Sequence, residues 1–172
     1  MKKRIALLFV VVLTLLSVLT ACGEKKQDKQ DIYAAINSEK DFRNVNLRCT
    51  ADEVIASEEF ELSKGDPDKE EWMLFYKDVE LDGSNVTIAY ISSGGVFQEG
   101  AIFYCPEDAE TFFEGLKARM LQLHGPGYIS YGTNLLHWEI DDKCYEICLL
   151  DKGQVAYLVM TKEYSDMIEN HE

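Results

Sequence analysis

Basic side chains are scarce in this chain. Lys and Arg total 17 against 31 Asp and Glu in 172 residues, which gives a formal net charge of −14 at pH 7. Proteins that bind nucleic acids neutralise phosphates with basic side chains. We therefore expect no nucleic-acid partner, and we expect any partner selected by long-range charge to be basic.

Proline is also scarce, with three residues, while 47% of the chain is hydrophobic and 11% is aromatic. Disordered and fibrous chains have the opposite balance, so this composition indicates a folded globule. The length fits one domain with a single core of ordinary size.

Sequence motifs for catalysis or cofactor binding are absent. The chain contains no nucleophile elbow, zinc-protease helix or phosphate-cradling glycine loop, and no Cys-x-x-Cys or His-x-x-x-His pair. The acidic loop 66–70 begins like a calcium loop, but Glu71 stands where the sharp turn requires glycine. We therefore expect no cofactor and no metal, and we predict that this loop is solvated.

The first 22 residues have the layout of an export signal. Lys2, Lys3 and Arg4 form a basic start, and residues 5–21 follow without a charged side chain. The segment ends with the residues Leu19-Thr20-Ala21-Cys22, which resemble the lipobox of bacterial lipoproteins. That resemblance implies cleavage before Cys22, acylation of its thiol, and a protein anchored to the cell envelope, facing away from the cytoplasm.

The domain organisation follows from this reading. Residues 1–21 are the predicted signal peptide, and residues 22–40 are a mostly polar tether behind the lipid. Residues 41–172 are the predicted globular domain. The partners we expect are the lipid bilayer, through acylated Cys22, and a protein or ligand that the sequence does not identify.

The globular part shows a pattern that occurs twice. Thr50 and Glu53 form a capping box that predicts a short helix over 51–60, and apolar spacing predicts a second helix from Pro106 to about residue 124. Strand-like segments follow each helix, over 72–79, 86–92 and 96–104, and then over 134–140, 143–150 and 154–161. The short connections favour antiparallel pairing. We predict an α+β fold of two αβββ halves, with one antiparallel sheet and its helices on one face.

This order of elements resembles the beta-lactamase-inhibitor-like fold and small envelope lipoproteins of the SmpA-OmlA type. The residues that carry the resemblance are Thr50-Ala51-Asp52-Glu53-Val54, which open the first helix, and Leu123-His124-Gly125-Pro126-Gly127, which close the second. Those groups usually have a glycine shortly before the first helix, where this chain has Leu47-Arg48-Cys49. Proteins of these groups bind other proteins without catalysis, so the resemblance implies a binding role.

Four cysteines remain after Cys22, and outside the cytoplasm they can form disulfides. Cys144 and Cys148 share a face of one predicted strand but lie roughly 13 Å apart at ~3.3 Å per residue, too far for a bridge. Each would have to pair with Cys49 or Cys105. The alternative is four buried thiols that pack as small apolar side chains.

Aromatic side chains are frequent in the predicted strands, and an antiparallel sheet covered on one face leaves alternate residues exposed on the other. Tyr and Trp are favoured at binding hot spots. We therefore predict a binding surface anchored by Trp72 and Tyr76, with Tyr90 on the neighbouring strand. The alternative is that this second face is covered as well.

Two functions stay open at this point. The absence of catalytic motifs favours a membrane-anchored lipoprotein that acts as a non-catalytic interaction or ligand-binding module. The alternative is a cell-envelope hydrolase with an unrecognised active site. That alternative requires His124 or His137 to lie in a cleft beside a carboxylate and a Ser, Thr or Cys.

The substitution Cys22→Ala tests the predicted lipidation. We expect the variant to accumulate as an unlipidated precursor, because the thiol that accepts the lipid is gone. Metabolic labelling with a fatty-acid probe measures this. A Cys22→Ala protein that still takes up the label would contradict the lipobox assignment.

Overall fold

The structure is a computed structural model, and it describes residues 36, 39–81, 84–130, 132 and 134–170. The predicted signal peptide, Cys22 and most of the predicted tether lie outside the described residues. Within the part of the chain that is described, no helix is both long and apolar enough to cross a membrane.

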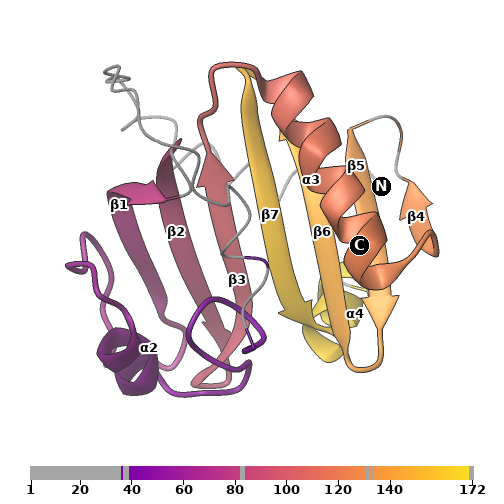
Figure 1. Ribbon diagram of the computed structural model, residues 1–172. Helices are drawn as coiled ribbons and strands as arrows, with labels where there is room; N and C mark the ends of the chain where they lie inside the picture. Colours follow the sequence, from indigo (N-terminus) through magenta and orange to yellow (C-terminus); the bar gives the residue numbers. More distant parts are fainter. Residues whose placement is uncertain (1–35, 37–38, 82–83, 131, 133, 171–172) are drawn as a thin grey trace.

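One antiparallel sheet forms the centre of the molecule, in the strand order β1-β2-β3-β7-β6-β5-β4 (Figure 1). The described strands are β1 (Met73–Leu81), β2 (Ser84–Ser93), β3 (Val96–Tyr104), β4 (Tyr128–Ser130), β5 (Leu135–Ile140), β6 (Lys143–Leu150) and β7 (Gln154–Thr161). The predicted α+β class and antiparallel sheet are confirmed. The second half has one strand more than predicted, because β4 pairs with β5.

The two halves meet where β3 pairs with β7. Their register runs from Glu99 opposite Met160 to Tyr104 opposite Val155. This pairing joins the meander β1-β2-β3 to the strands β4 to β7, so the seven described strands share one sheet.

Helix α2 (Ala51–Ser57) begins at the predicted capping box. The backbone N–H of Thr50 donates to Glu53 Oε2 over 2.8 Å, and the N–H of Glu53 donates to Thr50 Oγ1 over 3.4 Å. The helix is three residues shorter than predicted, and Val54 is its fully buried contact with the core.

Helix α3 (Ala109–His124) begins after Asp108, whose carboxylate accepts a hydrogen bond from the N–H of Thr111 over 3.0 Å. It ends at Gly125, as predicted. The side chains that it buries against the sheet follow the predicted helical spacing, and they are Phe112, Phe113, Leu116 and Met120.

The helices lie on both faces of the sheet, which corrects the prediction that one face carries them all. We call the face covered by α2 and α3 the first face; it includes Tyr76, Tyr90 and Tyr157. Helix α4 (Lys162–Asn170) packs Tyr164 against the opposite, second face. Figure 1 shows α3 in front of the sheet and α4 behind it. Because every residue of β7 is buried, both of its faces are covered.

The predicted binding surface is therefore wrong. Trp72, Tyr76 and Tyr90 are at most 2% exposed and belong to the first-face core. Tyr90 packs against the ring of Tyr76, with ring centroids 5.9 Å apart. Alternation separated Tyr76 from Phe75 correctly, but the register shift between Tyr76 and Val79 turns Val79 to the first face, against strict alternation. The apolar character of both faces concealed which one the helices cover.

The chain before α2 also belongs to the first-face core. Ile36, which the sequence placed in the tether, is buried there together with Phe42. The ring of Phe42 lies against the backbone of β3 at Gly100, where an added Cβ would come within 2.5 Å of it. The packed domain therefore begins before residue 41, and Gly100 is the residue that leaves room for this segment.

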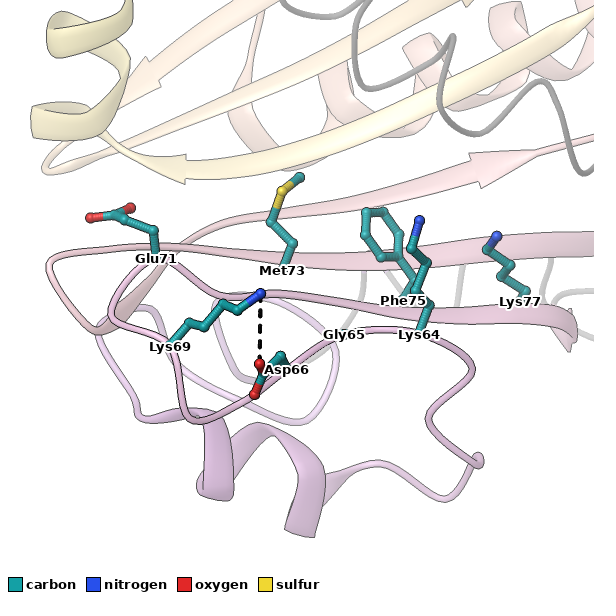
Figure 2. Close-up of a pocket in the computed structure, with 8 residues that line it drawn as sticks. All are labelled: Lys64, Gly65, Asp66, Lys69, Glu71, Met73, Phe75 and Lys77. Atoms are coloured by element: carbon teal, nitrogen blue, oxygen red, sulfur yellow. Dashed lines mark ion pairs between the residues drawn. The ribbon is translucent and has the colours of Figure 1, made fainter.

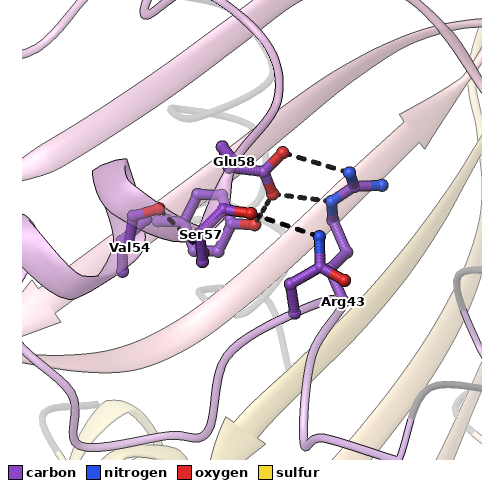
Figure 3. A network of polar contacts seen from close by, with 6 residues as sticks. Arg43, Val54, Ser57 and Glu58 are labelled. Atoms are coloured by element: carbon purple, nitrogen blue, oxygen red, sulfur yellow. Dashed lines mark hydrogen bonds and ion pairs between the residues drawn. The ribbon is translucent and has the colours of Figure 1, made fainter.

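A buried ion pair holds this segment to α2. Arg43 Nε donates to Glu58 Oε1 over 2.7 Å and Nη2 donates to Oε2 over 3.0 Å, with both side chains at most 5% exposed (Figure 3). The hydroxyl of Tyr90 donates to the same carboxylate. The two hydrogen bonds from Arg43 and the third from Tyr90 pair the buried charge of Glu58. A buried ion pair needs such hydrogen bonds to offset the loss of solvation.

Replacing Glu58 tests the importance of this pair. Glu58→Gln removes the negative charge and leaves that of Arg43 buried, so we expect a loss of about 2 to 4 kcal/mol in the free energy of unfolding. Urea denaturation followed by tryptophan fluorescence measures the loss. The adjacent, exposed Glu59 provides the control, because Glu59→Gln should cost less than about 0.5 kcal/mol. Equal stability of the two variants would show that the Arg43–Glu58 pair does not stabilise the fold.

Candidate functional site

A groove with a volume of about 470 Å³ lies along the edge strand β1, on its second-face side (Figure 2). We call it the β1 groove. Its lining residues come from β1 and from the loop before it, and they are Lys64, Gly65, Asp66, Lys69, Glu71, Met73, Phe75 and Lys77.

The loop is held against β1 by backbone hydrogen bonds. The N–H of Lys64 donates to Phe75 O over 3.2 Å, and the N–H of Phe75 donates to Lys64 O over 2.8 Å. Gly65 follows with φ +142°, and an added Cβ would lie 2.4 Å from the carbonyl oxygen of Met73. Only glycine permits this approach, so Gly65 sets the position of the loop that forms one wall of the groove.

The floor of the β1 groove is apolar. Phe75 is buried, and Met73 is 38% exposed, which makes it one of the few large apolar side chains that face solvent. Both side chains lie on the same side of β1 in Figure 2, with the Phe75 ring beside the two lysines at that end. An apolar floor with a few polar groups at its margin is the usual composition of a ligand site.

The margin of the groove carries both signs of charge, but the acids are already engaged. Asp66 pairs with Lys69 over 3.6 Å, and Glu71 Oε1 accepts a hydrogen bond from the N–H of Gly94 over 3.0 Å. Among the described residues, no carboxylate forms an ion pair with Lys64 or Lys77. The acidic loop 66–70 is exposed except for a half-buried Pro67, consistent with the predicted solvated loop.

A second group of polar side chains lies inside the second face. His137 on β5 is directly opposite Glu146 on β6, and its Nδ1 lies 2.8 Å from Glu146 Oε1. Cys144 lies two residues from Glu146 on the same strand face, and Glu99 is on β3. His137 and Cys144 are 1% exposed, and Glu99 is 8% exposed.

The pKa values of this group are displaced by burial and by its own charges. Burial and the negative charge of Glu146 raise the pKa of Glu99 to about 8. Burial by itself would lower the pKa of His137, but hydrogen bonds with Cys144 and Glu146 outweigh it and raise the pKa to about 9. At neutral pH Glu99 is therefore protonated, and His137 is an imidazolium that contacts Glu146.

Part of the geometry that the hydrolase alternative requires is present in the group of His137, Glu146 and Cys144. His137 does lie beside a carboxylate and a thiol, as that reading requires. None of the three side chains lines the β1 groove, and His137 and Cys144 are almost completely shielded from solvent. His124 is elsewhere, stacked on Tyr145 with ring centroids 4.3 Å apart, and burial lowers its pKa.

The cysteines described by the structure are thiols. Cys49, Cys105, Cys144 and Cys148 form no disulfide with one another. Cys144 and Cys148 share the second face, which confirms their predicted common side of β6. Burial raises the pKa of Cys148 to about 12, and burial together with Glu53 raises that of Cys49 to about 11. Both thiols are therefore poor nucleophiles at neutral pH.

The sequence indicated His137 as a candidate beside an unnamed carboxylate and thiol, but it did not indicate Glu146 or the β1 groove, although each left a signal. The two-residue turn at Asp141 and Asp142 sets the β5–β6 register, and this register places His137 opposite Glu146. Alternation along β1 puts Met73, Phe75 and Lys77 on one side of the strand. No sequence pattern indicated that the loop at Gly65 packs against β1 and forms a wall of the groove. In the part of the chain that is described, no group of three or more His, Cys, Asp or Glu is arranged to bind a metal.

Comparisons with protein-family models, curated proteins and solved structures found no match to this chain.

The pKa values of Glu99 and His137 predict how stability depends on pH. Both are raised above the ordinary values, so the folded chain holds these protons more tightly than the unfolded chain. The stabilisation from Glu99 is therefore lost between about pH 4.5 and 8, and that from His137 between about pH 6.5 and 9. We expect the melting temperature to fall between about pH 5 and 9, as measured by circular dichroism.

Glu99→Gln should flatten this fall, because a neutral amide does not ionise. The variant should melt above the unsubstituted protein at pH 9, and the difference should shrink toward pH 5. Glu80→Gln removes an exposed carboxylate on β1 and is the matched control. A pH profile unchanged by Glu99→Gln would show that this carboxyl is not the titrating group.

Proposed function

We propose that this chain is a lipoprotein of the bacterial cell envelope that acts as a non-catalytic binding module. Cys22, acylated after removal of residues 1–21, anchors it to the membrane on the side facing away from the cytoplasm. The support for the anchor is the sequence itself, where Leu19-Thr20-Ala21-Cys22 follows a basic start and an uncharged apolar run. The lipid has to hold the domain by itself, because so acidic a chain is repelled by anionic headgroups.

The observation that supports a binding role is the β1 groove. It is open to solvent, its floor is apolar, and Lys64 and Lys77 at its margin are exposed or half-buried. Trp72, Tyr76 and Tyr90 cannot serve as anchors from the core. We therefore place binding at the groove, where exposed apolar surface and uncompensated charge occur together.

The hydrolase alternative rests on the contact of His137 with Glu146 and Cys144. A nucleophile has to touch its substrate, and Cys144 is 1% exposed. The second face would have to open before this group could act. Alkylation of Cys144 in the folded protein would favour the hydrolase over the binding module.

Photo-crosslinking in intact membranes tests whether the groove is occupied. Benzoylphenylalanine placed at position 73 should crosslink to a defined species, because Met73 lies on the groove floor. The same residue at position 167 is the control, since Met167 on α4 has a matching exposure of 39%. The adduct should weaken when Lys64 and Lys77 are both changed to Gln.

Mass spectrometry identifies the crosslinked species and compares the two positions. Crosslinking at position 73 that does not exceed the level at position 167 would overturn the assignment of binding to the groove. An adduct at position 73 that persists after the loss of both lysines would show that the groove binds a partner without help from the two lysine charges.

A further inference from the structure

The β1 groove has a charge opposite to that of the chain as a whole. Acidic residues outnumber basic ones by 31 to 17 in the chain, whereas three lysines and two acids line the groove. Asp66 is paired with Lys69, and Glu71 is hydrogen-bonded to the backbone of Gly94. Lys64 and Lys77 form no ion pair with the described residues, and the charged side chains that line the groove sum to a net charge of +1.

These two lysines are held at one end of the groove. Lys64 is fixed by its backbone pairing with Phe75, and Lys77 lies two residues beyond Phe75 on β1. Figure 2 shows both side chains beside the Phe75 ring and directed to the same side of the strand. An anion that lies between the two ammonium groups is attracted by both of them. The lysine ammonium group is a mobile point charge that donates hydrogen bonds to carboxylate and phosphate alike.

The rest of the groove is suited to an apolar group. Phe75 and Met73 continue from the lysines along the floor, and a methionine side chain adapts its shape to what it contacts. A volume of about 470 Å³ is at the lower end of the range for small-molecule sites. The groove thus presents a cationic end next to an apolar floor of limited size.

We propose that the β1 groove binds a single-chain anionic amphiphile, with its carboxylate or phosphate between Lys64 and Lys77 and its apolar tail over Phe75 and Met73. This inference rests on the proposed function, which places binding at this groove, and it adds the chemical class of the ligand.

Two other occupants fit the observations less well. An extended peptide cannot add to β1 at Phe75, because Lys64 already uses both of its backbone hydrogen-bonding groups. The acidic chain as a whole attracts a basic protein, but the lysines at the groove itself disfavour a cationic group at this place. An intact diacyl lipid would need room for two tails, whereas the groove offers one short apolar floor.

Binding of simple amphiphiles to the full lipidated chain tests the proposal. The chain is reconstituted in phosphatidylcholine nanodiscs, and isothermal titration calorimetry follows octanoate and octyl phosphate, with empty nanodiscs as the blank. We expect both anions to bind at one site. Octyltrimethylammonium, which has the same tail and the opposite charge, should give only the blank signal.

Substitutions then assign the site. Changing Lys64 and Lys77 together to Gln should weaken octanoate binding at least about tenfold, because both charge-assisted contacts are lost. Lys152→Gln, in the exposed turn between β6 and β7, removes one positive charge at a distance from the groove and should leave the affinity within about twofold. Met73→Gln should weaken binding, whereas Met167→Gln should not. Melting curves check that each variant is folded.

Each outcome decides the question. Equal affinity in the double lysine variant, equal binding of the cationic amphiphile, or no heat above the blank would overturn the proposed ligand class. Binding to vesicles of anionic diacyl lipid without binding of octanoate would overturn it in favour of a membrane surface. If a partner crosslinks at position 73 but octanoate does not bind, the proposed binding role is supported and only the proposed ligand class is wrong.

Discussion

The pairing of β3 with β7 is the contact on which the architecture depends. Each half of the chain supplies strands that pair among themselves, and the ladder from Glu99–Met160 to Tyr104–Val155 makes them one sheet. With the two halves joined, the first face carries a continuous aromatic core beneath α2, α3, Ile36 and residues 39–50. The same ladder brings Glu99 of β3 to the part of the second face where His137 and Glu146 lie. Both the core and the buried charges therefore depend on this contact.

Much of this fold could be predicted from local signals. The capping box at Thr50 and the helical spacing that ends at Gly125 indicated α2 and α3, because side-chain caps and periodicity depend on near neighbours alone. The strand positions and antiparallel pairing followed from alternation and short turns. The face of the sheet that α4 covers and the presence of β4 did not. They depend on which face of the sheet is left to cover and on the extent of β5, and neither quantity is local.

The candidate site was harder to predict for the same reason. Trp72, Tyr76 and Tyr90 were assigned to a surface because composition shows that a residue suits an interface without showing whether it is exposed. The β1 groove depends on Gly65 lying against Met73 O, a contact across the loop that no motif encodes. The buried pair of His137 and Glu146 was within reach of the hairpin register, but only once β5 and β6 were taken as partners.

The strand order has a consequence for when this protein can fold. β7 is the last of the described strands in the sequence but lies between β3 and β6 inside the sheet. Until residues 154–161 leave the ribosome, β3 has an open edge and no strand pairing joins the two halves. Such long-range pairing is slow, because a large loop closes before the contact forms. A chain exported as we propose would cross the membrane unfolded, and this topology delays completion of the sheet until its last strand has crossed.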